Sequence, residues 1–192
     1  GEPYVLELVK RMDDNYMIDE NQREKLLRHF GGYHEQLYKD ALTGAYNRRY
    51  FEEKIRKSTV SAGVAMIDLD DFKLYNDSFG HDTGDVVLIT FVNIIKNCTR
   101  KTDMLIRYGG DEFVVYLKNL TGEMARTYME TFQRMISQLT LPTGEVVELS
   151  ASAGGAAFPE QGEDVMSLCK SADMALYKVK QNGKADFKMK GM

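Results

Sequence analysis

The sequence has few cysteines, no long apolar run and no excess of positive charge. Its two cysteines, Cys98 and Cys169, lie in apolar stretches with helical spacing, which predicts small buried side chains instead of a disulfide or a metal pair. No apolar run approaches the roughly 20 residues that span a bilayer, and no signal peptide is evident. We therefore expect a cytoplasmic protein with no membrane partner in this part, although a longer protein could still be tethered to a membrane.

The net charge of −4 argues against a general nucleic-acid binder, because such proteins carry a basic surface. Binding of a single nucleotide needs only a few basic side chains at one site, and a protein with a net charge of −4 can supply them. With 43% hydrophobic and 28% charged residues, the composition is that of a folded globular protein. The 192 residues suffice for one domain with a sizeable core and an appendage.

A tight turn at Gly109-Gly110 is followed by two acidic residues, Asp111 and Glu112. Apolar runs on both sides of the turn predict a β-hairpin over 104–117, with the glycines at its tip. An ordinary solvated turn would have the same composition. The missing Cβ atoms would nevertheless let a large ligand approach the backbone closely.

A second acidic cluster, Asp68 to Asp71, follows the apolar run 64–67, which predicts a buried strand. Carboxylates at the end of a buried strand cost stability unless they bind something. If the two strands share a sheet, the two clusters would meet and hold divalent cations through hard oxygen ligands, as nucleotidyl-transfer enzymes hold Mg²⁺. An EF-hand calcium loop is excluded, because Phe72 occupies its fifth position and no glycine follows.

The order of the predicted elements indicates an α/β protein of the α+β type. We predict helices over 48–57, 85–100, 123–139 and 164–181, and strands ending at Asp68, within the 104–117 hairpin and over 146–157. The apolar residues of 123–139, Met124 and Phe132 among them, are expected in the core, and the stretch 4–9 has the composition of a strand. This βαββαβ order is the ferredoxin-like or polymerase-palm pattern, with a central antiparallel sheet flanked by helices. The strand order 4-1-3-2 of that fold would pair the strand ending at Asp68 with the strand beginning at Glu112.

Several motifs in order resemble the GGDEF family, the bacterial diguanylate cyclases. Besides the hairpin, the matching segments are 40–44 with 47–49, 68–73 with 76–77, and 79–82 with 84–85. A set of motifs spread over roughly residues 40–185 is far more specific than one glycine turn. We therefore expect a GGDEF diguanylate cyclase domain over 40–192, and a linker or the remnant of an upstream sensory domain over 1–39. Ala45 and the segment 152–155 depart from the family pattern, and we expect packing changes there.

The resemblance implies a reaction in which two GTP molecules condense into cyclic di-GMP and release two pyrophosphates. It implies that Asp68, Asp111 and the Leu69 carbonyl bind two Mg²⁺ ions per active site, with Mn²⁺ as an alternative. Asp111 or Glu112 would act as the base, and the sequence leaves that choice open. Lys73 would stabilise the charge that develops during the reaction.

The resemblance also implies where the substrate binds. Asn76, His81 and Asp85 would contact guanine, and a carboxylate suits the guanine N1–H and N2–H₂ donors. Backbone N–H groups of Asp71, Phe72 and Lys73 would hold the terminal phosphates. The ammonium groups of Lys180 and Lys184 would bind phosphate as well. Surface lysines at a helix end would look the same in sequence, and a lone histidine is more often structural.

Arg100 and Asp103 resemble the product-inhibition motif of the family, although an Arg and an Asp three residues apart usually form a surface pair. Because one active site holds one GTP, the resemblance implies a homodimer during catalysis and cyclic di-GMP as inhibitor. The alternative is a degenerate GGDEF module that binds GTP or cyclic di-GMP and relays a signal. The presence of all the expected catalytic and guanine-contacting residues favours the enzyme.

Overall fold

The computed structural model describes residues 36–58, 62–119 and 149–189, with further positions at 21, 24, 25, 124, 127, 128, 130–132, 134, 140, 141, 143, 144, 146 and 147. The chain divides into two compact units, Gly1–Lys39 and Asp40–Met192. In the first unit, positions 21, 24 and 25 are helical, and the strand expected near residues 4–9 lies outside the described residues. The second unit carries all the candidate site residues.

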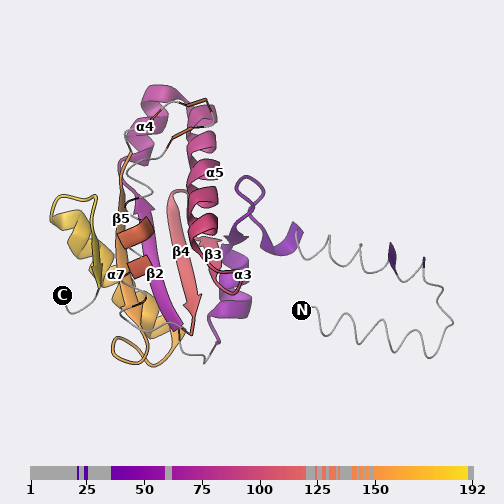
Figure 1. Cartoon of the computed structure of the whole chain (residues 1–192), viewed down its shortest axis with the longest axis vertical. Helices are drawn as coiled ribbons and strands as arrows, with labels where there is room; N and C mark the ends of the chain where they lie inside the picture. The colour runs from indigo at the N-terminus through magenta and orange to yellow at the C-terminus, as the bar shows by residue number, and fades with distance from the viewer. Residues whose placement is uncertain are drawn as a thin grey trace. The chain divides into compact units, whose positions relative to one another are not determined.

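A six-stranded mixed sheet forms the centre of the second unit (Figure 1), in the order β1-β3-β4-β2-β5-β6. The strands are β1 Tyr46–Asn47, β2 Ala62–Leu69, β3 Met104–Arg107, β4 Glu112–Lys118, β5 Ala151–Ala157 and β6 Phe187–Met189. The four central strands β3, β4, β2 and β5 are antiparallel to one another and follow the predicted 4-1-3-2 order. The short outer strands β1 and β6, each parallel to its neighbour, were not predicted.

The helices agree with the prediction in their general positions and differ in three details, of which the first is that the helix predicted over 85–100 begins four residues earlier, at His81. The helices are α3 Arg48–Tyr50, the π-helix η1 Phe51–Ile55, α4 Phe72–Phe79, α5 His81–Cys98 and α7 Val165–Gln181. The predicted helix over 48–57 is therefore one α-turn followed by a π-helical segment, and α4 was not predicted as a helix. The α7 helix begins as expected, because Asp164 caps it through a reciprocal capping box with Ser167.

Alternate residues of the strands face two separate hydrophobic clusters. One cluster joins Ile67, Phe113 and Val115 to the buried face of α5. The other joins Val64 and Val114 to residues of η1 and α7. The sheet is therefore covered on both faces, and the strand ends remain at an edge where polar groups can gather.

The small residues of β5 are explained by the close approach of α7. A Cβ added to Gly154 would collide with the backbone of Ala172 and Leu176, so a larger residue there would push α7 off the sheet. Ala45 is fully buried in the α5-side cluster. Both departures from the family pattern are thus packing features, except that Ser152 has a polar role described below.

The predicted helix over 123–139 is described only in part. Its described positions are helical, and Phe132 is buried as expected. Met124, predicted to face the core, is 47% exposed, so that prediction is wrong; Met135, Ile136 and Leu139 lie outside the described residues. The last central strand starts at Ala151 instead of Val146, which forms only an isolated bridge with Thr140.

Both cysteines are free and partly buried, as predicted. They pack against different clusters, Cys98 on the α5 side and Cys169 on the α7 side. Burial, with the nearby carboxylate charges, raises the pKa of the Cys169 thiol to about 12, so this thiol stays protonated at neutral pH. Among the described helices, none is long and apolar enough to cross a bilayer.

Candidate active site

The two acidic clusters meet at one edge of the sheet, as predicted. In the register of β2 and β4, Asp68 lies directly opposite Glu112. The Leu69 N–H donates to the Asp111 carbonyl at 3.2 Å, which ties the end of β2 to the hairpin tip. The acidic edge, defined as Asp68, Asp111 and Glu112, thus joins residues more than forty positions apart in the sequence.

The Asp68 carboxylate is nearly buried, and it forms an ion pair with Lys180 from the end of α7, with Nζ 2.6 Å from Oδ2. Burial raises the pKa of Asp68, and the charges of Asp111 and Glu112 raise it further, against the lowering effect of Lys180. The carboxylates therefore repel one another at this edge. A bound cation relieves such repulsion.

The oxygen donors of the acidic edge suit Mg²⁺ or Mn²⁺. Across the described residues, no three His, Cys, Asp or Glu side chains are arranged as a ready metal cage. Mg²⁺ does not need one, because it usually binds one or two carboxylates and completes its shell with waters and substrate phosphates. Asp68, Asp111 and the Leu69 carbonyl fit that kind of site.

The hairpin tip is held in place by Arg107. Its guanidinium donates to the Gly110 carbonyl from Nε at 3.1 Å and from Nη2 at 2.8 Å, and to Asp40 from Nη1 at 3.0 Å. Burial alone would raise the pKa of Asp40, but hydrogen bonds from Thr43 and the Arg107 charge outweigh it and lower that pKa. Asp40, in the first motif of the chain, therefore helps to position the hairpin tip.

The residues predicted to bind phosphate gather beside the acidic edge. Asp71 precedes α4 with a φ of +54°, and its side chain does not cap the helix. It is instead paired with Lys184, whose Nζ lies 2.7 Å from Oδ1. The first N–H groups of a helix have no partner within the helix, so those of Phe72 and Lys73 suit an anion.

The residues predicted to contact guanine lie at the junction of α4 and α5. Asn76 points at Gly84, where an added Cβ would collide with the Asn76 Oδ1 atom. Within the described residues, this buried oxygen has no hydrogen-bond partner. Buried amide oxygens are rarely left unpaired, so the atom suits a ligand N–H donor. Asp85 and His81 are exposed on the first turns of α5.

A cavity of about 420 Å³ lies between the acidic edge and α7. It is lined by Asp68, Glu112, Asp173, Met174, Leu176, Tyr177, Lys178, Lys180 and Gln181. In the described part of the chain, the residues predicted to contact guanine do not line it. The cavity therefore gives access to the Asp68–Lys180 ion pair from the α7 side.

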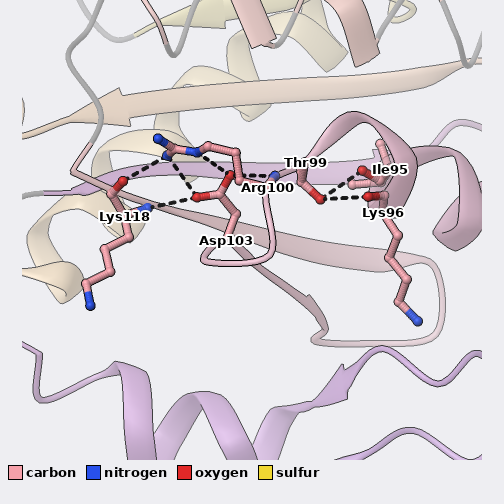
Figure 2. Close-up of polar contacts among 6 residues, drawn as sticks. All are labelled: Ile95, Lys96, Thr99, Arg100, Asp103 and Lys118. Carbon is pink, nitrogen blue, oxygen red and sulfur yellow. Dashed lines mark hydrogen bonds and ion pairs between the residues drawn. The ribbon is translucent and has the colours of Figure 1, made fainter.

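Arg100 and Asp103 lie at the opposite end of the hairpin (Figure 2). Arg100 donates to both carboxylate oxygens of Asp103, from Nε at 3.0 Å and from Nη2 at 2.9 Å, and also to the Lys118 carbonyl at 2.8 Å. The Lys118 N–H in turn donates to Asp103. In this structure the pair closes the base of the hairpin.

Comparison with known proteins identifies the domain. A family model described as the diguanylate cyclase GGDEF domain matches residues 37–186. The chain belongs to the GGDEF family. This confirms the resemblance seen in its motifs, and the sheet order and flanking helices are those of GGDEF structures.

Curated relatives in the GGDEF family include a probable diguanylate cyclase, DgcC of Escherichia coli, which is 35% identical over 76% of this chain and 41% of its own length. Diguanylate cyclase A of Treponema denticola is 38% identical over 67% of this chain and 34% of its own length. The chain therefore spans about two fifths or less of these relatives.

Two solved GGDEF structures are also similar. A Pseudomonas aeruginosa TpbB variant comprising only the GGDEF domain has a TM-score of 0.73 at 31% identity, covering 80% of this chain and 94% of its own. The coiled coil and GGDEF domain of DgcB from Caulobacter crescentus, solved in complex with c-di-GMP, has a TM-score of 0.77 at 25% identity, covering 95% and 98%.

Two features of this GGDEF site were missed in the sequence. The Arg107 contacts could have been suspected, because Arg107 stands two residues before the Gly109-Gly110 tip. Asp70 belongs to the acidic cluster 68–71, and the sequence does not indicate that its carboxylate is buried among hydrogen-bond donors of the protein. The residues that donate to Asp70 are 80 or more positions away in the chain, so no local sequence pattern predicts these contacts.

Proposed function

We propose that this domain is a diguanylate cyclase that condenses two GTP molecules into cyclic di-GMP with release of two pyrophosphates. The observation that carries the proposal is the placement of Asp68 opposite Glu112, beside an uncapped helix N-terminus flanked by two lysines. This edge combines oxygen donors for a divalent cation with donors for a triphosphate. Phosphoryl transfer requires little else from a protein.

The chain's own residues would divide the work as follows. Asp68, Asp111 and the Leu69 carbonyl would hold two Mg²⁺ ions, which when bound offset phosphate charge and lower the pKa of the attacking 3′-hydroxyl. Asp111 or Glu112 would accept the hydroxyl proton. Lys73, exposed at the first turn of α4, would face the charge that develops on the phosphates.

Phosphate binding would recruit both lysines. Lys180 and Lys184 now pair with Asp68 and Asp71, so each is held at the acidic edge before substrate arrives. Metal binding by Asp68 would free the Lys180 ammonium for the phosphates, and the Lys184 ammonium would contact them from its place beside Asp71. The exchange keeps the number of unpaired charges low throughout.

Guanine selection would rest on Asn76 and Asp85, with His81 as a further contact. The unpaired Asn76 oxygen can accept from guanine, and the Asp85 carboxylate can accept from the N1–H and N2–H₂ pair. Adenine lacks that donor pair. A site built for it rejects the wrong base by roughly 10⁴-fold.

Two copies of the domain would face each other during catalysis, each presenting one GTP. Inhibition by cyclic di-GMP would act at Arg100 and Asp103, away from the acidic edge. The c-di-GMP complex of the similar DgcB structure supports a product-binding GGDEF domain in general terms. Because Arg100 already contacts Asp103 and Lys118, the product would have to share or replace those contacts.

The test is to incubate the purified chain with Mg²⁺ and either GTP or ATP, and to identify the products by chromatography and mass spectrometry. Calorimetric titration measures the binding of each nucleotide separately. The proposal predicts cyclic di-GMP and pyrophosphate from GTP alone, with a rate that rises more than linearly with protein concentration. GTP binding without any product would instead support the degenerate signal-relay module. Comparable binding of GTP and ATP would contradict the assigned guanine contacts.

A further inference from the structure

Asp70 lies between the two proposed ligand residues Leu69 and Asp71 but has a different environment. Only 4% of it is exposed, and its carboxylate accepts three hydrogen bonds. Oδ1 accepts from the Ser152 hydroxyl at 2.7 Å, while Oδ2 accepts from the Ser150 hydroxyl at 2.7 Å and from the Ala185 N–H at 3.1 Å. These bonds satisfy the buried charge within the protein, so the carboxylate has little capacity left for a metal.

The third of these bonds reaches the loop that follows α7. Lys184 and Ala185 both have left-handed backbone conformations, with φ of 63° and 50°. Two consecutive residues other than glycine are uncommon in this region, and each costs on the order of 1 kcal/mol. Surrounding contacts must hold them there, and the Asp70 carboxylate accepts the N–H of the second one.

The consequence falls on Lys184. Its backbone N–H donates to the Val179 carbonyl at 3.2 Å, and its side chain reaches Asp71 at the start of α4. Lys180, by contrast, belongs to α7 itself and is placed by the helix. Loosening the loop would therefore displace Lys184 and leave Lys180 where it is.

We propose that Asp70 is a positioning residue for triphosphate binding: it anchors the backbone at Ala185 so that Lys184 stands at the N-terminus of α4. The inference rests on the proposed GTP site and adds that binding at this site depends on the Asp70–Ala185 hydrogen bond. Asp70 does not touch the substrate. Its contribution is expressed through Lys184 alone.

The first experiment is a double-mutant cycle read by calorimetric titration with a non-hydrolysable GTP analogue in the presence of Mg²⁺. Asp70→Ala and Lys184→Ala should each weaken analogue binding by about tenfold, because each removes one charge-assisted phosphate contact. The two together should weaken it by the same tenfold. Asp70→Ala combined with Lys180→Ala should instead multiply the two separate losses.

A substitution in the loop after α7 tests the same contact if the Asp70→Ala variant does not fold. Ala185→Pro removes the N–H that Asp70 accepts and cannot adopt the observed φ, yet leaves the buried carboxylate and both serines intact. It should reproduce the loss seen with Lys184→Ala. Ala185→Gly keeps the N–H and should bind the analogue as the parent does. Glu160→Gln is the control for loss of a carboxylate charge: Glu160 is exposed, three residues beyond the end of β5, and this variant should also bind as the parent does.

The outcomes separate the inference from the function on which it rests. If the parent chain does not bind the analogue, the proposed GTP site and this inference both fail. If the parent binds but Ala185→Pro binds equally well, or the Asp70 and Lys184 losses multiply, the positioning role is wrong and the GTP site stands. In steady state, Ala185→Pro should raise the KM for GTP by about tenfold and leave kcat within about twofold, since only substrate binding is affected.

Discussion

Two buried aspartates pair with basic side chains in different ways: Asp68 lies on β2 beside the tip of the β3–β4 hairpin, and Asp103 lies at the base of that hairpin. Across the described residues, the Asp68 carboxylate makes one ion pair, with the flexible ammonium of Lys180 beside a cavity. The Asp103 carboxylate is completely buried and binds the rigid Arg100 fork, the Arg100 N–H and the Lys118 N–H. The first pair can exchange its partner for a metal or a phosphate, whereas the second is built into the fold.

The difference follows from where each carboxylate finds its hydrogen bonds. Besides the Arg100 guanidinium, two backbone N–H groups donate hydrogen bonds to the Asp103 carboxylate, and these bonds cannot break without local unfolding of the chain. Asp68 is satisfied by a side chain and repelled by its acidic neighbours. Similar pairs of charges are therefore held rigidly at one end of the hairpin and left exchangeable at the other, where we propose that the ligand binds.

The largest effect should come from Asp68→Asn. Removing this ligand should lower turnover by about 10³-fold or more, because bound metal contributes several kcal/mol to the transition state. The free energy of unfolding should not fall, since the substitution removes a buried charge that its acidic neighbours repel. Initial rates and denaturant unfolding measure the two effects, and a rate within tenfold of the parent would remove Asp68 from the site.

At the other end, Asp103→Ala should mainly affect stability. Loss of the buried carboxylate leaves Arg100 and two backbone N–H groups without their acceptor, which should lower the free energy of unfolding by about 3 kcal/mol. At a temperature where the variant is folded, its initial rate should stay within about threefold of the parent. A stable Asp103→Ala protein would show that the pair is only a surface contact.

Arg100→Ala should have a smaller effect on stability and a specific effect on regulation. Its side chain is 38% exposed, and the Arg100 and Lys118 N–H groups still donate to the buried Asp103 carboxylate, so we expect a loss of about 2 kcal/mol, smaller than in Asp103→Ala. The inhibition constant for cyclic di-GMP should rise by about tenfold, through the lost charge-assisted contacts to the product. Lys101→Ala, a neighbouring exposed cation, is the matched control. An unchanged inhibition constant in Arg100→Ala would leave this pair with a structural role alone.

The smallest effect concerns a third aspartate, Asp40, whose pKa is lowered by Thr43 and Arg107 despite the opposing effect of burial. A group with a lowered folded-state pKa contributes stability above its ordinary value of 3.8 and loses it as the pH falls through the folded value. Asp40→Asn should therefore cost about 1 kcal/mol at neutral pH, and less in acid below pH 3.8. Equal costs at both pH values would mean that the Asp40 charge contributes nothing.

The sequence predicted the parts of the site that depend on local patterns. Apolar runs indicated that β2 and β4 are buried strands, the glycines marked the turn, and the βαββαβ order placed Asp68 next to Glu112. These features follow from the composition of buried strands and the geometry of hairpins. The register of β2 and β4 confirms them.

Other features depend on contacts between distant segments and could not be predicted in this way. The outer strands β1 and β6 have only two and three residues, too few for a periodic signal. The partners of Asp70 come from the start of β5 and from the loop after α7. The left-handed conformation of Ala185 could not be predicted either, because the residue is not a glycine. Tertiary packing decides all of these.

The most direct test of the account compares the two ends of the hairpin in one assay. Purified parent, Asp111→Asn and Arg100→Ala proteins would be incubated with GTP and Mg²⁺, and early formation of cyclic di-GMP would be followed by chromatography after confirming that all three are folded. We expect product from the parent and from Arg100→Ala at similar initial rates, and none from Asp111→Asn. Synthesis by Asp111→Asn near the parent rate would contradict the assignment of the acidic edge as the catalytic centre.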